Sequence, residues 1–292
     1  MYQIFDAHCH IYPLDIAPRA VAGVDAFYDG LPVKPRDGTA QTLLETGREA
    51  GISRFLVHSV ATTPHQVASI NGFIARETEN SGGAFVGFGA LHPDSQDQEA
   101  DVRNLISLGL RGVKLHPDIQ RFPADSPRAM AIYELCEAAG LPVLMHTGDF
   151  RFDYSNPNRV ANVLRVFPKL KLIGAHLGGW SVWDEAARVL PDFPNFMVDS
   201  SSCSRWLSPG RMRQIVRAYG ANRVLFGTDY PMWRQREEID ALMKLNLTDD
   251  EYRRIFWDNA EALFTLSDPQ TASHGRDRDW CSSPSAAGDL PR

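Results

Sequence analysis

Short apolar runs alternate with longer helical patterns along nearly the whole chain, and this alternation constrains the fold more than any other feature. Each run is rich in β-branched and aromatic residues and is short enough to form one barrel strand. Eight runs can be distinguished, at residues 3–7, 54–58, 85–90, 112–115, 142–145, 171–175, 195–199 and 223–227. Repeated strand and helix units of this kind build a parallel sheet covered by helices. The sequence therefore predicts an α/β fold, a (β/α)8 TIM barrel in a single domain.

Helical stretches separate the apolar runs, and several stop at a glycine, which suits the left-handed conformation at a helix C-cap. The clearest stretches are residues 39–50, 97–108, 127–139 and 209–219. Residues 11–38 are rich in Pro, Gly and Asp without periodicity, so we predict a long first loop that can cover the barrel mouth as a lid. Two or three extra C-terminal helices are expected over residues 237–264. We expect the barrel to span residues 1–266 and the polar residues 267–292 to form a disordered tail.

Composition and charge limit the classes of partner. The chain has 292 residues, 43% of them hydrophobic, and a formal net charge of −6 with scattered basic residues, which argues against nucleic-acid binding. No apolar run reaches the roughly 18 residues that a membrane helix needs, and no leader-like start is present, so a cytoplasmic location is expected by default. Four cysteines without paired short spacing, at positions 9, 136, 203 and 281, predict reduced thiols and no cysteine-based zinc site.

Histidine and aspartate residues follow the ends of the predicted strands, where barrel enzymes build their active sites. His8 and His10 follow the first run and, being separated by one residue, share one face of a strand. His146 ends the fifth run, His176 ends the sixth and Asp229 follows the eighth. These five side chains come together only if the barrel closes.

Neutral imidazole and carboxylate form a ligand set for zinc and, less tightly, for iron or manganese. Each residue alone has an ordinary explanation, because a histidine at a strand end is often a hydrogen-bonded structural group and an aspartate is often a cap. Together, in register around a barrel, they predict a bound divalent metal. An open coordination position would let that metal lower the pKa of a bound water from about 15.7 to about 7. The sequence thus predicts a metal-dependent enzyme acting on a small molecule.

Six short segments carry a resemblance to a known family: DAHCH at 6–10, GVKLHP at 112–117, MHTG at 145–148, AHLGG at 175–179, FGTDYP at 226–231 and DNAEALF at 258–264. With them the sequence resembles the amidohydrolase superfamily, and within it the amidohydrolase-related branch. That branch includes aminocarboxymuconate semialdehyde decarboxylase and uncharacterised TIM-barrel metal-dependent hydrolases. The resemblance implies one divalent ion, with zinc expected before manganese or iron. It implies as ligands His8, His10, His146 and Asp229, and it implies that His176 acts as general base. Relatives of this kind often form homodimers.

A second ion is the alternative that the resemblance leaves open. In binuclear members of the superfamily the histidines of strands five and six bind a second metal, bridged by a carbamylated lysine or a carboxylate. Here these would be His146 and His176, and Lys114 near the end of strand four could supply the bridge. Lys114 can equally be a neutral or ion-paired barrel residue.

Several other residues are candidates for substrate contact. His116 shares a strand face with Lys114, and Arg151, Trp180 and Tyr230 lie in loops predicted on the active face. An arginine can clamp a carboxylate and an aromatic ring can cover a substrate ring, although loop packing explains each position equally well. For His116, and for the other strand-end residues His58 and His92, structural hydrogen bonding is the preferred interpretation.

Two reactions fit this set of residues. The first is hydrolysis of a small carboxylate-bearing ester, lactone or amide, in which Asp229 and His176 handle the proton. The second is non-oxidative decarboxylation of an unsaturated or aromatic acid at the same site. A pair of arginines aimed at the leaving carboxylate would favour decarboxylation, and a roomy pocket without them would favour hydrolysis. A barrel with a purely structural metal is disfavoured, because such a site is closed by four ligands and needs no additional base such as His176.

Overall fold

The computed structural model describes residues 2–30 and 35–265, and it confirms the predicted TIM barrel. The predicted tail at 267–292 lies outside the described residues. Strands β1, β2 and β3 form one parallel sheet, and β4 to β9 form another in sequential order. Phe88 alone separates β3 from β4, so these two correspond to the single predicted run at 85–90. The strands are β1 (Phe5–His10), β2 (Arg54–His58), β3 (Phe85–Gly87), β4 (Gly89–Ala90), β5 (Val113–Leu115), β6 (Val143–Met145), β7 (Leu172–Gly174), β8 (Phe196–Asp199) and β9 (Val224–Leu225).

Hydrogen bonds between β1 and the segment after β9 close the barrel. The His10 amide donates to the Tyr230 carbonyl at 2.7 Å, and Cys9 forms a parallel bridge with Tyr230. Asp6 fastens the same seam, because its carboxylate accepts hydrogen bonds from the Thr228 amide at 2.9 Å and the Thr228 hydroxyl at 2.5 Å. The seam therefore lies beside two predicted ligand segments, one in β1 and one after β9.

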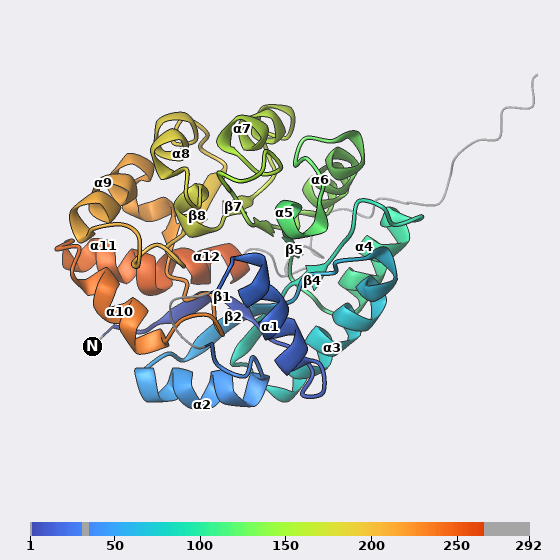
Figure 1. Cartoon of the computed structure of the whole chain (residues 1–292), viewed down its shortest axis with the longest axis horizontal. Coiled ribbons are helices and arrows are strands. Elements are labelled where there is room, and N and C mark those ends of the chain that lie inside the picture. The colour runs from blue at the N-terminus through green and yellow to red at the C-terminus, as the bar shows by residue number, and fades with distance from the viewer. Residues whose placement is uncertain (1, 31–34, 266–292) are drawn as a thin grey trace, which may run out of the picture.

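Helices form a ring around the strands, and α1 is drawn over β1 and β2 inside that ring (Figure 1). The helices are α1 (Ala17–Phe27), α2 (Ala40–Ala50), α3 (Val67–Asn80), α4 (Gln98–Ser107), α5 (Pro117–Gln120), α6 (Pro127–Ala139), α7 (Pro157–Val166), α8 (Trp183–Val189), α9 (Pro209–Tyr219), α10 (Gln235–Met243), α11 (Asp249–Arg253) and α12 (Asn259–Thr265). Short 3-10 turns are η1 (Pro64–Gln66), η2 (His176–Gly178) and η3 (Ala221–Arg223), and η4 (Arg254–Asp258) is a π-helical turn. Among the described helices, none combines the length and apolar character needed to cross a membrane.

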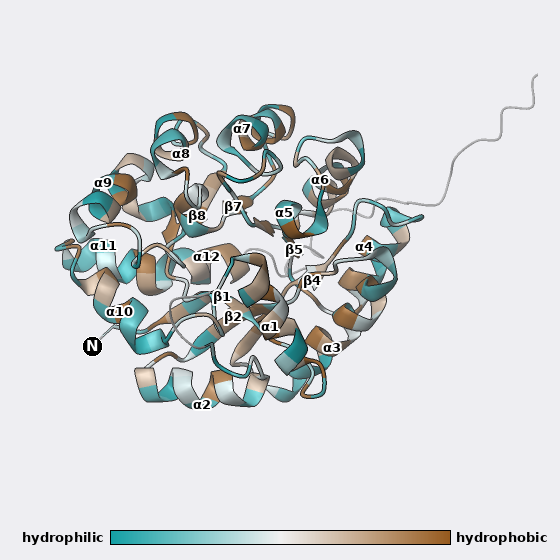
Figure 2. Cartoon of the chain, viewed as in Figure 1, coloured by the Kyte–Doolittle hydropathy of each residue, from teal (hydrophilic) through white to brown (hydrophobic). Residues whose placement is uncertain are grey.

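The hydrophobic core has two layers, and Figure 2 shows apolar residues concentrated on the strands and on the inward faces of the helices. The larger layer lies between the strands and the surrounding helices. The smaller layer fills the barrel interior, where Phe5, Phe88 and Leu144 pack with Leu263 and Phe264 of α12. Because Phe5 begins β1, α12 closes the end of the barrel at which the strands begin. The opposite end is left for the functional site.

A register shift in β1 decides where its histidines point. The pairing of β1 with β2 is irregular between Asp6 and Cys9. Simple alternation would place Phe5 and Cys9 on the same face of the strand. Instead, Phe5 belongs to the barrel interior and Cys9 to the outer layer. Irregularities of this kind re-aim side chains next to active sites, and here the shift leaves His8 and His10 at the barrel mouth.

Two predicted boundaries need correction. The first strand covers Phe5–His10 rather than residues 3–7, so both histidines are part of the strand. The prediction of an irregular loop across residues 11–38 is wrong over Ala17–Phe27, which form α1. This helix buries only Ala17 and Val21, so it leaves almost no apolar periodicity in the sequence. The prediction of extra C-terminal helices is confirmed by α10, α11 and α12.

A buried glutamate in α10 gives a stability prediction. Glu238 is buried and accepts a hydrogen bond from the Ser204 hydroxyl at 2.7 Å. Burial raises the pKa of Glu238 from 4.5 to about 7. Because the unfolded state ionises first, folding stability is lost as pH rises from about 4.5 to about 7. We expect Glu238→Gln to raise the free energy of unfolding at pH 8 by up to about 3 kcal/mol, with little change at pH 4.

Urea unfolding at the two pH values measures this difference. The matched control is Glu237→Gln on the same helix, because Glu237 is half exposed and pairs with Arg205 at the surface. A stabilisation by Glu238→Gln that is equal at both pH values would contradict the proton-linked explanation.

Candidate metal centre

The carboxyl ends of the strands open into a cavity of about 570 Å³, which we call the chamber. Its walls come from the strand ends, from α1 and the residues after it, and from loops after β7, β8 and β9. All five residues predicted at the strand ends line it, together with Lys114 and His116. The remaining lining residues are Val24, Tyr28, Asp29, Gly30, Ile119, Trp180, Ser202, Trp206, Met232 and Trp233.

Three ligand atoms meet at one point of the chamber floor. His8 Nε2 lies 3.3 Å from His10 Nε2, and Asp229 Oδ1 lies 3.4 Å from each of these nitrogens. Ligands at neighbouring positions around an ion with bonds of about 2.1 Å are about 3.0 to 3.4 Å apart. This three-donor cluster of His8, His10 and Asp229 therefore has the spacing of one face of a coordination sphere, and its donor types suit a divalent cation.

A buried aspartate orients His8. Asp199, the last residue of β8, lies with Oδ2 2.8 Å from His8 Nδ1, so Nδ1 donates to this carboxylate and Nε2 is the nitrogen that faces the cluster. The other oxygen of Asp199 accepts hydrogen bonds from the His176 amide and from the amide and hydroxyl of Ser201. Burial opposes ionisation of Asp199, but His8 outweighs it and holds the pKa of Asp199 below its usual value. Carboxylates in this position fix the tautomer of a ligand imidazole.

We expect Asp199→Asn to weaken divalent metal binding by about 10–100-fold, the usual cost of losing such a supporting carboxylate. If the asparagine oxygen faced His8, its NH2 group would face the amides of His176 and Ser201, which are also hydrogen-bond donors. The side chain therefore cannot satisfy both sets of contacts. Competition with a chelating dye measures the affinity. The control is Asp192→Asn, an exposed aspartate before the same strand. Wild-type affinity in Asp199→Asn would show that His8 is oriented without the carboxylate.

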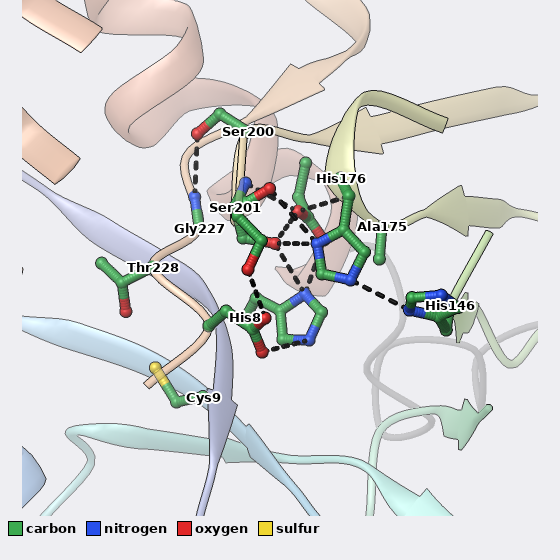
Figure 3. Close-up of polar contacts among 12 residues, drawn as sticks. His8, Cys9, His146, Ala175, His176, Ser200, Ser201, Gly227 and Thr228 are labelled. Atoms are coloured by element: carbon green, nitrogen blue, oxygen red, sulfur yellow. Dashed lines mark hydrogen bonds and ion pairs between the residues drawn. The ribbon is translucent and has the colours of Figure 1, made fainter. Parts of the chain in front are cut away.

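His146 and His176 form a second pair of facing nitrogens, and Figure 3 shows the rings of His8, His146 and His176 turned toward one another while Cys9 points away. His146 Nε2 donates to the Gly148 carbonyl at 3.0 Å, and His176 Nδ1 lies 2.9 Å from the Ser201 hydroxyl. The two remaining nitrogens, His146 Nδ1 and His176 Nε2, are 3.0 Å apart.

Burial lowers the pKa of His176 to about 4 and holds the pKa of His146 well below its usual value. Both rings are therefore neutral near pH 7, and two lone pairs face one another across 3.0 Å. This arrangement is stabilised by a cation or by a proton donor placed between or beside them.

Asp229 is held in place from the side away from the cluster. Its Oδ2 accepts a hydrogen bond from the Ser202 hydroxyl at 2.5 Å, and Trp233 Nε1 donates to the same hydroxyl at 2.6 Å. Burial opposes ionisation, but His8 and the contact with His10 outweigh it and hold the pKa of Asp229 well below its usual range. The backbone of Asp229 has φ of 59°, a left-handed conformation that a non-glycine residue rarely adopts. The carboxylate is thus anionic and fixed toward the cluster.

Lys114 lies beside the three-donor cluster. Its Nζ is 3.0 Å from His8 Nε2, its side chain is buried, and burial lowers its pKa to about 8. The structure thus brings the candidate bridging residue to the predicted metal ligands. Carbamylation of Lys114 stays a prediction.

Two of the candidates for substrate contact line the chamber. The ring of His116 stacks on His146 with centroids 4.0 Å apart, and its Nε2 lies 3.3 Å from the Tyr28 hydroxyl. Trp180 makes T-shaped contacts with Tyr28 at 5.1 Å and with Trp206 at 5.9 Å. Loops that are far apart in sequence therefore build one aromatic wall.

The structure places the other two candidates outside the chamber lining. Tyr230 is completely buried, and its hydroxyl donates to the Thr39 carbonyl at 2.9 Å. The Arg151 guanidinium donates to the Asp149 carboxylate and to the Phe27 carbonyl, so it joins the loop after β6 to the end of α1. Neither residue is aimed at the chamber, because each side chain is already used in packing two segments together.

Sequence reasoning missed Asp199 and Asp6, which support the ligands from behind. Asp199 ends a predicted strand, so the same strand-end rule that selects His176 would have found it. Asp6 gives no such signal, because it comes before the end of β1 and its partner Thr228 is distant in sequence. The chamber residues Trp206 and Trp233 were also missed, since their loops show no pattern that distinguishes a wall of the chamber from a surface.

Comparisons with known proteins agree with the barrel fold. The sequence profile of the amidohydrolase family matches residues 5–266, and no curated protein is matched. An uncharacterised TIM-barrel protein from Bordetella bronchiseptica is 22% identical with a TM-score of 0.76, covering 91% of this chain and 99% of that one. The 2,6-dihydroxybenzoate decarboxylase from Rhizobium is 19% identical with a TM-score of 0.66, covering 92% and 100%. The 5-carboxyvanillate decarboxylase from Novosphingobium aromaticivorans, solved with manganese, is 14% identical with a TM-score of 0.71, covering 91% and 96%. Because the family profile spans nearly the whole barrel, this chain belongs to the amidohydrolase family.

Proposed function

We propose that this chain is a metal-dependent hydrolase that cleaves a small carboxylate-bearing ester, lactone or amide. The observation that carries the proposal is the convergence of several imidazoles and one carboxylate in the chamber, with donor atoms 3.3 to 3.4 Å apart in the three-donor cluster. His8, His10 and Asp229 would hold the ion, with His146 as the fourth ligand. A divalent ion supplies a Lewis acid and brings the pKa of a bound water close to neutrality. Zinc suits this donor set, and manganese or iron are alternatives.

The residues of the chain supply proton transfer and orientation. His176 is neutral, and its Nδ1 is held by Ser201, so Nε2 can accept a proton from the attacking water and return it to the leaving group. Asp229 remains anionic and can accept a hydrogen bond from the same water. Hydrolysis requires a group that transfers the proton and a group that orients the water, and His176 and Asp229 can fill these two roles.

The chamber suits a small planar acid. Its volume of about 570 Å³ falls within the usual size of small-molecule sites. Trp180, Trp206 and Tyr28 can cover a ring or an unsaturated chain. Among the described lining residues Lys114 is the one lysine or arginine, so it can pair with a substrate carboxylate. The lack of an arginine pair in this part of the structure favours hydrolysis over loss of a carboxylate.

Decarboxylation of an aromatic or unsaturated acid is the second candidate. It is favoured by the solved relatives with the same fold that act as hydroxybenzoate and carboxyvanillate decarboxylases. In that reaction neutral His176 would take a proton from a hydroxyl group of the bound substrate and deliver it to the ring carbon as the bond to the carboxylate breaks and carbon dioxide leaves. The aromatic wall of the chamber fits such a ring as well as it fits an unsaturated lactone.

Elemental analysis and a substrate panel test the proposal together. Protein purified without added metal or chelator is expected to carry roughly one equivalent of a divalent metal. The loaded enzyme is then assayed against carboxylate-bearing esters, lactones and amides and against hydroxybenzoates, with products identified by mass spectrometry. Hydrolysed products support the first candidate, and carbon dioxide release supports the second. A protein that binds no divalent metal even on titration would overturn both.

A further inference from the structure

His58 ends β2 inside the barrel wall, next to the histidines of β1. It pairs in register with His10, and its side chain is completely buried. Among the described residues, neither ring nitrogen of His58 has a hydrogen-bond partner. A neutral imidazole has one donor and one acceptor, and a buried polar group without a partner costs about 1–3 kcal/mol. The protein part of the structure therefore leaves the polar groups of His58 unsatisfied.

The polar groups around His58 are mainly the ligand imidazoles. Its ring centroid is 5.0 Å from that of His8 and 4.4 Å from that of His10, in edge-on contacts with interplanar angles of 69° and 87°. One ring nitrogen from each of these three residues lies within 4.8 Å of the other two. Nitrogens on opposite sides of one ion are about 4.2 Å apart. Ring adjustments of less than about one ångström would bring all three to a common ion.

A neutral histidine ring has one nitrogen with a lone pair, and this is the form in which histidine binds metals. His58 does not line the chamber, so it cannot contact substrate there. Its lone pair is available only to something held within the ligand cluster.

We propose that His58 is a further nitrogen ligand of the divalent ion held by His8 and His10. The inference rests on the proposed metal site and extends it on the buried side, away from the chamber. With His8, His10 and His146, His58 would be the fourth imidazole of the donor set, which would then be richer in nitrogen. Imidazole suits zinc and cobalt, whereas manganese prefers oxygen ligands. His58 would therefore set the metal preference of the site as well as its affinity.

Metal affinity in His58→Phe tests this role without an activity assay. Phenylalanine keeps a ring in the barrel wall and removes both nitrogens. We expect cobalt affinity, measured by competition with a chelating dye, to fall by more than about 100-fold, which exceeds the usual effect of a supporting residue. Manganese affinity should fall less, so the preference for cobalt over manganese should shrink. The cobalt absorption bands should also change in intensity as the coordination changes.

The matched control is His92→Phe. His92 is also a buried histidine that follows a strand, but its Nδ1 already accepts a hydrogen bond from the Asp94 amide at 3.1 Å. It does not line the chamber, so its replacement should leave metal affinity unchanged. Circular dichroism confirms that both variants are folded.

Two measurements can contradict the proposed role of His58. If His58→Phe does not fold, X-ray absorption of the wild-type cobalt protein decides, with four imidazole ligands expected and three contradicting the role of His58. Unchanged cobalt affinity in a folded His58→Phe would overturn the inference and leave the proposed metal site intact. A wild-type protein that binds no ion would overturn the proposed function itself, and this inference with it.

Discussion

Replacing Asp229 with alanine is expected to lower divalent metal affinity by more than about 100-fold, because supporting residues alone account for 10–100-fold. The change removes the single carboxylate of the three-donor cluster and leaves His8 and His10 facing one another at 3.3 Å without their anionic partner. When the metal concentration is limiting, the activity of the variant should fall at least as much as its metal occupancy. Elemental analysis of purified protein and dye competition measure the loss.

Two comparisons separate metal loss from misfolding in Asp229→Ala. The unfolding free energies of variant and wild type are compared in the presence of chelator, where both lack metal and should be similar. The exposed Asp184 supplies the control Asp184→Ala, which should keep its metal. An Asp229→Ala protein that retains wild-type metal content would remove this residue from the ligand set.

Gly148→Ala is expected to destabilise the fold by about 2–5 kcal/mol. Gly148 follows the end of β6 and has φ of 79°, where an alanine is strained. A Cβ there would lie 2.7 Å from the backbone of Gly179 and 2.8 Å from the amide nitrogen of Trp180. Backbone atoms cannot move aside as a side-chain tip can, so the loops after β6 and β7 must separate. Metal affinity should fall too, because the Gly148 carbonyl orients His146.

The control for Gly148→Ala is Gly140→Ala at the end of α6. Gly140 also has a left-handed φ, 69°, but a Cβ there meets no atom within 4 Å. Its replacement measures the backbone strain alone, expected to be about 1–2 kcal/mol. Urea unfolding of both variants in the presence of chelator gives their free energies of unfolding. The difference between the two losses measures the steric clash between the loops after β6 and β7. Equal losses would mean that the loops accommodate the extra methyl group.

Local physics explains why much of the architecture was predictable. Strand-length apolar runs and helices stopping at Gly51 and Gly140 depend on contacts within a few residues, and the structure confirms them within a few positions. The strand-end rule depends only on parallel strands meeting at one edge of the barrel. It therefore brought His8, His146 and Asp229 to one chamber without any knowledge of tertiary contacts.

Contacts between distant segments could not be read from the sequence. Whether a loop aromatic faces the chamber or the core depends on which segment packs against it, so Trp206 lines the chamber while Tyr230 is buried and donates a hydrogen bond to the Thr39 carbonyl. Likewise, Arg151 could not be distinguished from a substrate clamp until its partners Asp149 and Phe27 were known.

By itself, the sequence determined the barrel, the number of its strands and the set of histidines and aspartate at their ends, because these follow from periodicity and position along the chain. Only the tertiary structure decided how those groups are aimed. The register shift in β1, the carboxylate of Asp199 behind His8 and the unsatisfied ring of His58 all arise from pairing between segments far apart in sequence. The physical reason is that a metal site requires atoms placed to within a few tenths of an ångström, and hydrophobic periodicity carries no information at that scale.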